Sequence, residues 1–313
     1  MKKFEIISRS YLWLLIGFVI MAGSGILFFT NMRFSVEFTG GMNLRLATQL
    51  SENFAAETEQ FLANAGYVDA KVAAQVEASY SDVVIATDVS DDATMNTLAQ
   101  QIRAYLLEQK IVSSDAEIIQ LSVTGPSVWE YMQSAAIRAI LIGLLFMTVY
   151  MLFAFATIRK FVPPSILAMV TVATMFFDIF TPAGAYGLLM WINPTVQINT
   201  IFIVAILTTM GYSINDTIVI FDRVRENVDL LWEGAKNVSL AKVFESSLRQ
   251  SMRRSLMTGG ATLLVIVTMY VFGTGDMRDF AFTMGIGILS GTYSSLFIAA
   301  PLAYLLLRKK IVA

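Results

Sequence analysis

The stretch GYSINDTIVIFDRVREN, from Gly211 to Asn227, places Asn215 and Asp216 side by side in a segment that otherwise has the composition of a membrane span. The preceding residues, 198–210, are mostly apolar, and the first run of charges begins only at Asp222. Six residues of helix cover about 9 Å at roughly 1.5 Å per residue. Asp216 therefore lies too deep to be a surface carboxylate, and we expect it to face protein or water.

The polar residues of this segment recur at spacings of three and four. Those that share one helical face are Thr209, Tyr212, Ser213 and Asp216. An ionisable group within a span costs about 2.5–3.5 kcal/mol on insertion scales, and such groups usually mark an ion or proton path. The alternative is a hydrogen bond that only locks two helices together. Because the chain contains no histidine, carboxylates are its natural proton carriers.

The composition of the chain is that of a membrane protein, since 56% of its 313 residues are hydrophobic and only 15% are charged. About 20 apolar residues are needed to cross a bilayer as a helix. Six windows of that kind are predicted, near 11–30, 135–156, 164–187, 198–221, 255–273 and 280–307. The sequence therefore predicts an α-helical polytopic membrane protein with six transmembrane helices.

The distribution of Lys and Arg predicts the orientation of these spans. Basic residues gather at both termini and between the second and third and the fourth and fifth spans, which the positive-inside rule assigns to the cytoplasm. The segment from Asn31 to Gln133 instead has five basic and fourteen acidic residues, and we expect it outside. The predicted domains are 1–30 with the first span, 31–133 outside, and 134–313 with five spans and a cytoplasmic loop at 222–254.

The predicted external domain alternates between strand and helix patterns. Strands are expected at 43–48, 70–76, 81–87 and 117–123, and helices from Ser51 to Gly66 and from about Asp91 to Lys110. This order is that of a small α+β ferredoxin-like domain, with two helices on one antiparallel sheet. Its acidity argues against a nucleic-acid-binding surface. A simple spacer between two spans remains the alternative role.

Two further polar features lie in the other spans. Asp178 belongs to a stripe with Thr171, Thr174 and Thr181 on the third span, and it is either a coupling group or a structural one. Arg254, followed one turn later by Thr258, begins the fifth span and is either the charge partner of Asp216 or an ordinary cytoplasmic anchor.

Glycines in the last span predict close helix packing. Gly287 and Gly291 have the small-xxx-small spacing that lets two helices approach each other. We expect a second six-span chain to cover some of three surfaces, namely this glycine face, Asp178 and Thr208.

The chain resembles the SecD/SecF family of protein-export membrane proteins along its whole length. The resemblance is carried by GYSINDTIVIFDRVREN, by VEFTGG at 36–41, by TGPSV at 124–128, by Phe177-Asp178 and by RRSLMTGGATLL at 253–264. The family usually has Gly, a hydrophobic residue, Asp and Phe before its glycine pair. In this chain Ser35, Val36, Glu37 and Phe38 occupy those positions, so the acid is one methylene longer.

The resemblance implies a bacterial inner-membrane protein that pairs with SecD in a twelve-helix unit of the resistance-nodulation-division type. The other partners that it implies are the SecYEG channel, an unfolded secretory polypeptide and a YajC-like accessory protein, in a membrane lipid environment. It also implies that an ion gradient drives the external domains. Asp216 then matches the proton-carrying aspartate and Arg254 its basic partner, and Asp178 and Asn215 match polar positions, with Thr258 beside them.

Two other classes of function remain open from the sequence. The chain could be half of a proton-driven exporter of small molecules or lipids, or a structural assembly factor of the export channel. We expect no enzyme activity, cofactor or metal site, because no nucleophile and base, phosphate-binding glycine loop or metal-ligand spacing occurs. A carboxylate among hydroxyls suits either H⁺ or Na⁺ as the coupling ion.

The predicted orientation can be tested by labelling, because the chain contains no cysteine. Single cysteines introduced at Asn64 and Lys236 should react with a membrane-impermeant maleimide from opposite sides, the first from outside. Labelling of both from the same side would contradict the six-span topology.

Overall fold

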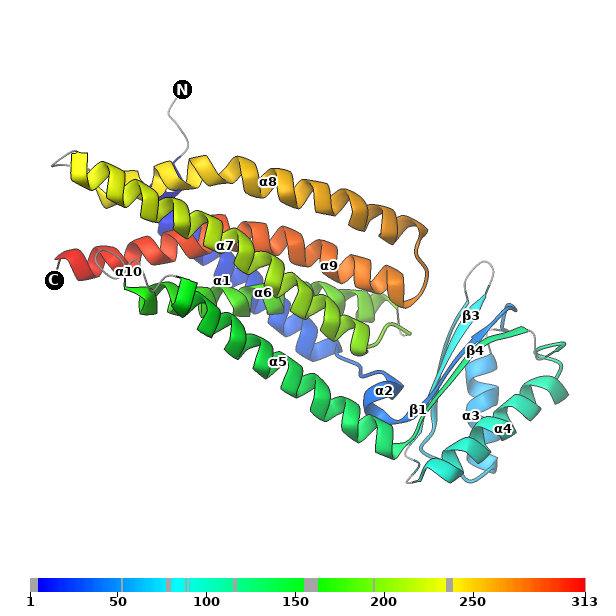
Figure 1. Cartoon of the computed structure of the whole chain (residues 1–313). Coiled ribbons are helices and arrows are strands. Elements are labelled where there is room, and N and C mark those ends of the chain that lie inside the picture. The colour runs from blue at the N-terminus through cyan, green and yellow to red at the C-terminus, as the bar shows by residue number, and fades with distance from the viewer. Residues whose placement is uncertain are drawn as a thin grey trace. The chain divides into compact units, whose positions relative to one another are not determined.

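The computed structural model describes residues 5–312 except 52, 77–79, 88, 90, 115–116, 155–162, 194 and 235–238. The chain forms two compact units, visible in Figure 1 as a helical bundle and as a sheet with two helices. The first unit comprises Met1–Thr30, Ile140–Leu188 and Ile201–Ala313, and the second comprises Asn31–Ala139 and Leu189–Thr200. The second unit therefore contains the segment just before the fourth span as well as the predicted external domain.

Six helices in the described residues are long and apolar enough to cross a membrane, which confirms the six-span prediction. Five of them are α1 (Ser10–Asn31), α5 (Pro126–Ala154), α6 (Pro164–Ile192), α7 (Thr200–Gly234) and α8 (Leu240–Phe272). The sixth is formed by α9 (Asp276–Tyr293), the π-helical segment η4 (Ser294–Ala299) and α10 (Ala300–Val312).

The segment predicted as a loop at 222–254 is largely helical. α7 has 35 residues, about 52 Å of helix, and both α7 and α8 continue well beyond an apolar window. The charges that end the apolar pattern pair along the helices, with Asp222 and Arg225 2.8 Å apart and Glu245 and Arg249 3.0 Å apart. Such pairs support a helix rather than end it. Residue Lys236, named above as a labelling site, lies outside the described residues.

Glu245 of α8 holds the start of the first span. Its Oε2 atom accepts hydrogen bonds from the backbone N–H groups of Ile6 at 2.9 Å and Ile7 at 3.0 Å, at the beginning of the short helix η1 (Ile7–Arg9). Both isoleucine side chains are buried. This carboxylate satisfies amides that have no partner within their own helix.

The second unit has the ferredoxin-like arrangement that the sequence predicts. Its elements are α2 (Val36–Thr39), β1 (Gly41–Leu46), α3 (Phe54–Asn64), β2 (Lys71–Val76), β3 (Ser81–Ala86), α4 (Asp92–Glu108) and β4 (Ile118–Thr124). The four strands form one antiparallel sheet in the order β2-β3-β1-β4. Only the four-residue helix α2 was not expected.

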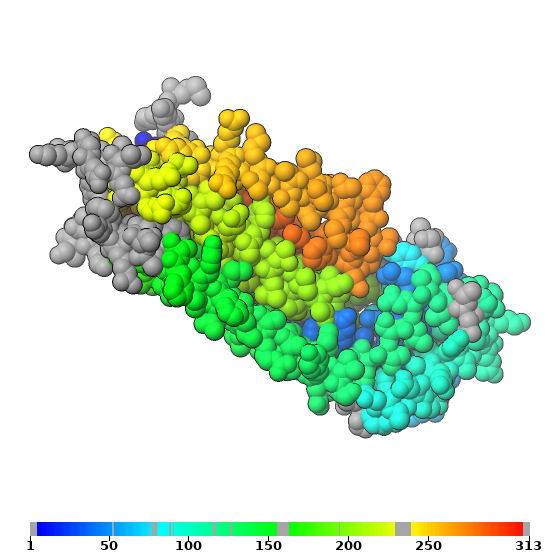
Figure 2. All heavy atoms as spheres, viewed as in Figure 1, coloured from blue at the N-terminus to red at the C-terminus, as the bar shows by residue number. Residues whose placement is uncertain are grey.

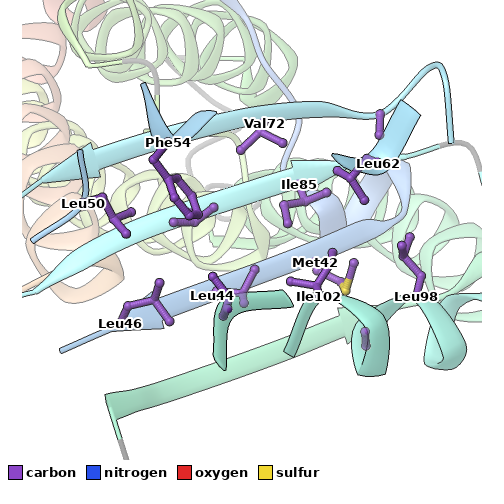
Figure 3. Packing of buried hydrophobic residues seen from close by; sticks show 14 of the residues in the cluster. Met42, Leu44, Leu46, Leu50, Phe54, Leu62, Val72, Ile85, Leu98 and Ile102 are labelled. Carbon is purple, nitrogen blue, oxygen red and sulfur yellow. The ribbon is translucent and has the colours of Figure 1, made fainter. Parts of the chain in front are cut away.

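The core of this unit lies between the sheet and its two long helices, as Figure 3 shows. β1 contributes Met42, Leu44 and Leu46, and α4 contributes Leu98 and Ile102, all buried. α4 begins where it does because Asp91 caps it, accepting hydrogen bonds from the backbone N–H groups of Ala93 and Thr94. Hydrogen bonds from Thr94 hold the pKa of Asp91 below its usual value. The cap therefore stabilises the fold above the unfolded-state pKa, and this contribution is lost on acidification.

Truncation of this core should destabilise the second unit. Leu98→Ala removes a side chain that is 0% exposed, and we expect a loss of about 2–5 kcal/mol in unfolding free energy. Leu107→Ala makes the same change at a position on α4 that is 36% exposed, and should cost roughly 0.5 kcal/mol. Pulse proteolysis of the full chain across a urea series measures both, and equal costs would contradict this packing.

Candidate functional site

One face of α7 buries a polar stripe within the helical bundle. Thr209, Ser213 and Thr217 are each at most 1% exposed, and Asp216 is 4% exposed. The predicted polar face is thus directed into the protein, and Thr217 extends it by one position. Buried polar groups without water must find partners in neighbouring helices.

Asp216 faces α8, where Ser255 lies against its carboxyl group and Arg254 acts on it through its charge. The Asp216 Oδ2 and Ser255 Oγ atoms are buried without a hydrogen-bond partner among the described residues. The carboxyl group is thus positioned beside the Ser255 hydroxyl and within reach of the Arg254 charge, and its Oδ2 atom retains unused acceptor capacity.

The structure does not bring all of the predicted residues into this site. Asn215 is exposed on the opposite side of α7, and Thr258 is exposed on α8 and donates its hydroxyl hydrogen bond to the Arg254 carbonyl at 2.9 Å. Arg254 is also exposed, although its charge reaches Asp216. The residue of α8 that faces Asp216 is Ser255, which the sequence pattern did not indicate. It is one of a buried row on α8 with Ser251 and Gly259.

Asp178 of α6 forms a second buried carboxyl site and is 1% exposed. The Ser213 hydroxyl donates to its Oδ2 atom at 2.5 Å, whereas its Oδ1 atom has no partner among the described residues. Pro182, one turn later in α6, has no N–H group to donate to the Asp178 carbonyl. The side chain of Asp178 therefore retains unused acceptor capacity.

The last span completes this cluster through the π-helical segment η4. Ser294 Oγ lies 3.3 Å from Ser213 Oγ, and Ser295 Oγ lies 3.0 Å from Thr217 Oγ1. Ser295 also donates to the Ser213 carbonyl at 3.2 Å. Consecutive residues of an α-helix point about 100° apart, so the wider π turn helps two adjacent serines to meet the same face of α7. The adjacent serines Ser294 and Ser295 were a sequence signal for this contact. In a regular α-helix, however, two adjacent residues do not point toward the same neighbour, so the pair did not suggest a shared face.

The glycines of α9 allow this close approach. A Cβ atom at Gly287 would overlap the Thr209 side chain, and one at Gly291 would lie 3.0 Å from Ser213 Cβ. The close-packing prediction is confirmed. Of the three surfaces expected to be partly covered by a second chain, the glycine face and Asp178 pack within the chain itself. Thr208, in contrast, is exposed.

Polar side chains also remain exposed on the described part of two spanning helices. They are Thr208 and Asn215 of α7 and Arg254 and Thr258 of α8. Figure 2 shows side chains of both helices, yellow-green to orange, at the surface of the bundle. Polar side chains on spanning helices are costly against lipid.

Comparison with known proteins gives consistent matches. A family model described as "Protein export membrane protein SecD/SecF, C-terminal" matches residues 105–309. The chain is 33% identical to protein translocase subunit SecF of Rhodothermus marinus over 214 residues, which covers 68% of this chain and 65% of the relative. It is 31% identical to the same subunit of Thermodesulfovibrio yellowstonii over 310 residues, covering 97% and 93%.

A solved structure shares the fold. The crystal structure of SecDF, a translocon-associated membrane protein from Thermus thermophilus, superimposes with a TM-score of 0.76 at 26% identity. The match covers 98% of this chain but 39% of the SecDF chain. The chain thus spans about two fifths of that protein.

The packing of α7 against α9 can be tested with a matched pair of glycine variants. Gly287→Ala should destabilise the bundle, because its methyl group has no room beside Thr209. Gly285→Ala adds the same methyl group to the same helix, where the nearest atom is 3.4 Å away, and should be tolerated. Thermal aggregation of the two variants in detergent distinguishes them, and equal midpoints would contradict the packing described.

Proposed function

Because this chain belongs to the SecD/SecF family of protein-export membrane proteins, we propose that it is a SecF subunit. We propose that it uses the proton motive force to promote the late stage of translocation of unfolded polypeptides. In this proposal it works with SecD beside the SecYEG channel, with a YajC-like protein as a possible accessory. It lies in the bacterial inner membrane with both termini in the cytoplasm and the second unit outside. Its role is mechanical and requires no covalent reaction.

The observation that carries the proposal is the environment of Asp216. The Asp216 carboxyl group is 4% exposed on a membrane-spanning helix, and its Oδ2 atom has no hydrogen-bond partner among the residues that the structure describes. Arg254 acts on this group through its charge. Burying such a group costs free energy that simple anchoring does not require. Protonation removes its charge and its attraction to Arg254. Without this attraction, α7 and α8 favour a different arrangement. One proton therefore controls which of two states the bundle adopts.

Asp178 has a different role in this proposal. Its Oδ2 atom is already held by Ser213, three residues before Asp216 on the same face of α7. It therefore fixes α6 and α9–η4 against α7 and provides the frame against which Asp216 operates. An uncharged Asp178 can also accept this hydrogen bond, so the frame does not require a buried charge.

Two observations support a SecD partner. The chain covers only 39% of the SecDF structure, and the names of the SecDF relatives join SecD to SecF in one chain. In addition, Asn215 and Thr208 of α7 would be exposed to lipid in an isolated bundle. A second six-span chain over this face would give their polar atoms partners.

Replacement of Asp216 tests the proposal. Asp216→Asn keeps the shape and hydrogen-bonding capacity but removes the titratable proton, so export into inverted vesicles should lose its stimulation by the gradient. Arg254→Ala should give a similar loss, whereas Asp216→Glu should retain part of the activity. Asp222→Asn provides a matched control, because Asp222 lies on the same helix and pairs with Arg225 at 2.8 Å.

Protein level and co-purification with SecD should be unchanged in the Asp216→Asn variant. Gradient-stimulated export at the wild-type rate in this variant would refute the proton-carrier role. It would favour a structural assembly factor, which needs no titrating group.

A further inference from the structure

Glu37, in the short helix α2 that follows the first span, caps the beginning of α7. Its Oε2 atom accepts a hydrogen bond from the Thr200 backbone N–H at 2.8 Å and another from the Thr200 hydroxyl at 2.7 Å. Thr200 is the first residue of α7. The first amides of a helix have no acceptor within it, and a carboxylate there also complements the helix dipole.

A backbone bridge holds the same junction. The Ser35 N–H donates to the Ile198 carbonyl at 2.9 Å, and the Ile198 N–H donates to the Arg33 carbonyl at 2.7 Å. Phe34 and Ile198 are thereby paired in parallel, as in a sheet. The segment that follows the first span is thus joined to the segment that precedes the fourth. Glu37 and Thr200, which meet at this junction, are 163 residues apart in the sequence.

Glu37 is itself held by the sheet of the second unit. The residues on either side of it, Val36 and Phe38, are 1% and 4% exposed. β1 begins immediately after α2, at Gly41, whose φ of 133° and close approach to the Ile85 carbonyl exclude a side chain. The Gln133 side-chain amide also donates to the Phe38 carbonyl. Any displacement of α2 is therefore shared with the sheet.

We propose that Glu37 is a positioning residue that couples α7, the helix bearing Asp216, to the external domain. The inference rests on the proposed function. Thr200 and Asp216 are separated by 16 residues of uninterrupted helix, a length of about 24 Å. A continuous helix transmits a shift along its axis, because bending it requires its backbone hydrogen bonds to break. The two hydrogen bonds to Glu37 transfer that shift from the end of α7 to α2 and the sheet.

The test compares two ways of weakening the cap. Glu37→Gln removes the charge with little change of shape, and Thr200→Val removes only the hydroxyl donor. Each should reduce gradient-stimulated export and leave export without a gradient unchanged. The loss in the double variant should be smaller than the sum of the two single losses, because both changes weaken hydrogen bonds to the same side chain. Glu57→Gln, at an exposed acid of α3, is the matched control.

Hydrogen exchange of the purified chain provides a readout independent of export. In Glu37→Gln the amides of the first turn of α7 should exchange at least about tenfold faster, because a hydrogen bond to a charged group is lost. Amides in the middle of α7 should be unaffected. Unchanged exchange in the first turn would overturn the cap, whatever the export result.

A covalent substitute separates coupling from simple stabilisation. Cysteines at Phe34 and Ile198, the paired residues of the backbone bridge, should form a disulfide that holds the junction without Glu37. Oxidation should restore gradient-stimulated export to the Glu37→Gln chain, and reduction should remove it again. If oxidation does not restore export, Glu37 does not act by holding α7 to the external domain.

The outcomes also separate this inference from the proposed function. Absence of gradient stimulation in the wild-type chain would contradict the proposed function itself. A stimulated wild-type chain together with fully stimulated Glu37→Gln and Thr200→Val variants would contradict only the coupling role of Glu37.

Discussion

The main constraint on the bundle is that two carboxyl groups must be accommodated among apolar helices. Water is excluded from such a position, so every partner has to come from a neighbouring span. Ser213 donates to Asp178, and Ser294 and Ser295 approach the same face of α7. These contacts require helices that approach closely, which the glycines of α9 permit, and a local change of helical pitch in η4. The packing of three spans thus depends on the polar stripe of α7.

The two carboxyl groups differ in how firmly they are held. Asp178 is engaged by a short hydrogen bond from Ser213, whereas Asp216 lies beside a hydroxyl and a cation, and each carboxyl group has one oxygen without a partner in the described part of the chain. A carboxyl group with strong hydrogen bonds stabilises one structure. A carboxyl group with weaker contacts can shift the balance between two structures when its charge changes. Both contacts lie on one face of α7, through Ser213 and Asp216. Glu37 and Thr200 anchor the far end of that helix.

Much of this architecture could be predicted from the sequence, because it follows from periodicity. Apolar windows predicted the six spans, alternation predicted the strand and helix order of the second unit, and the spacing of Ser213 and Asp216 predicted a buried polar face. Local patterns do not show which side of a helix meets which neighbour. For this reason Asn215 and Thr258 were expected at the site but are exposed, and Ser255 was overlooked. The charges at 222–254 end the apolar window and so predict a loop between spans, although they pair along continuing helices. The contact of Glu37 with Thr200 joins distant segments and has no local pattern at all.

The contact between Glu245 and the start of the chain has a consequence for the order of assembly. The acceptor for the Ile6 and Ile7 amides is 239 and 238 residues further along the chain. While the protein is being synthesised, the first span enters the membrane long before this acceptor exists. Its amino-terminal amides must therefore be hydrated until the beginning of the fifth span has emerged from the ribosome. The first span is thus inserted early, but its amino-terminal end packs against α8 only late in synthesis. A chain truncated before α8 would leave these amides without the Glu245 carboxylate.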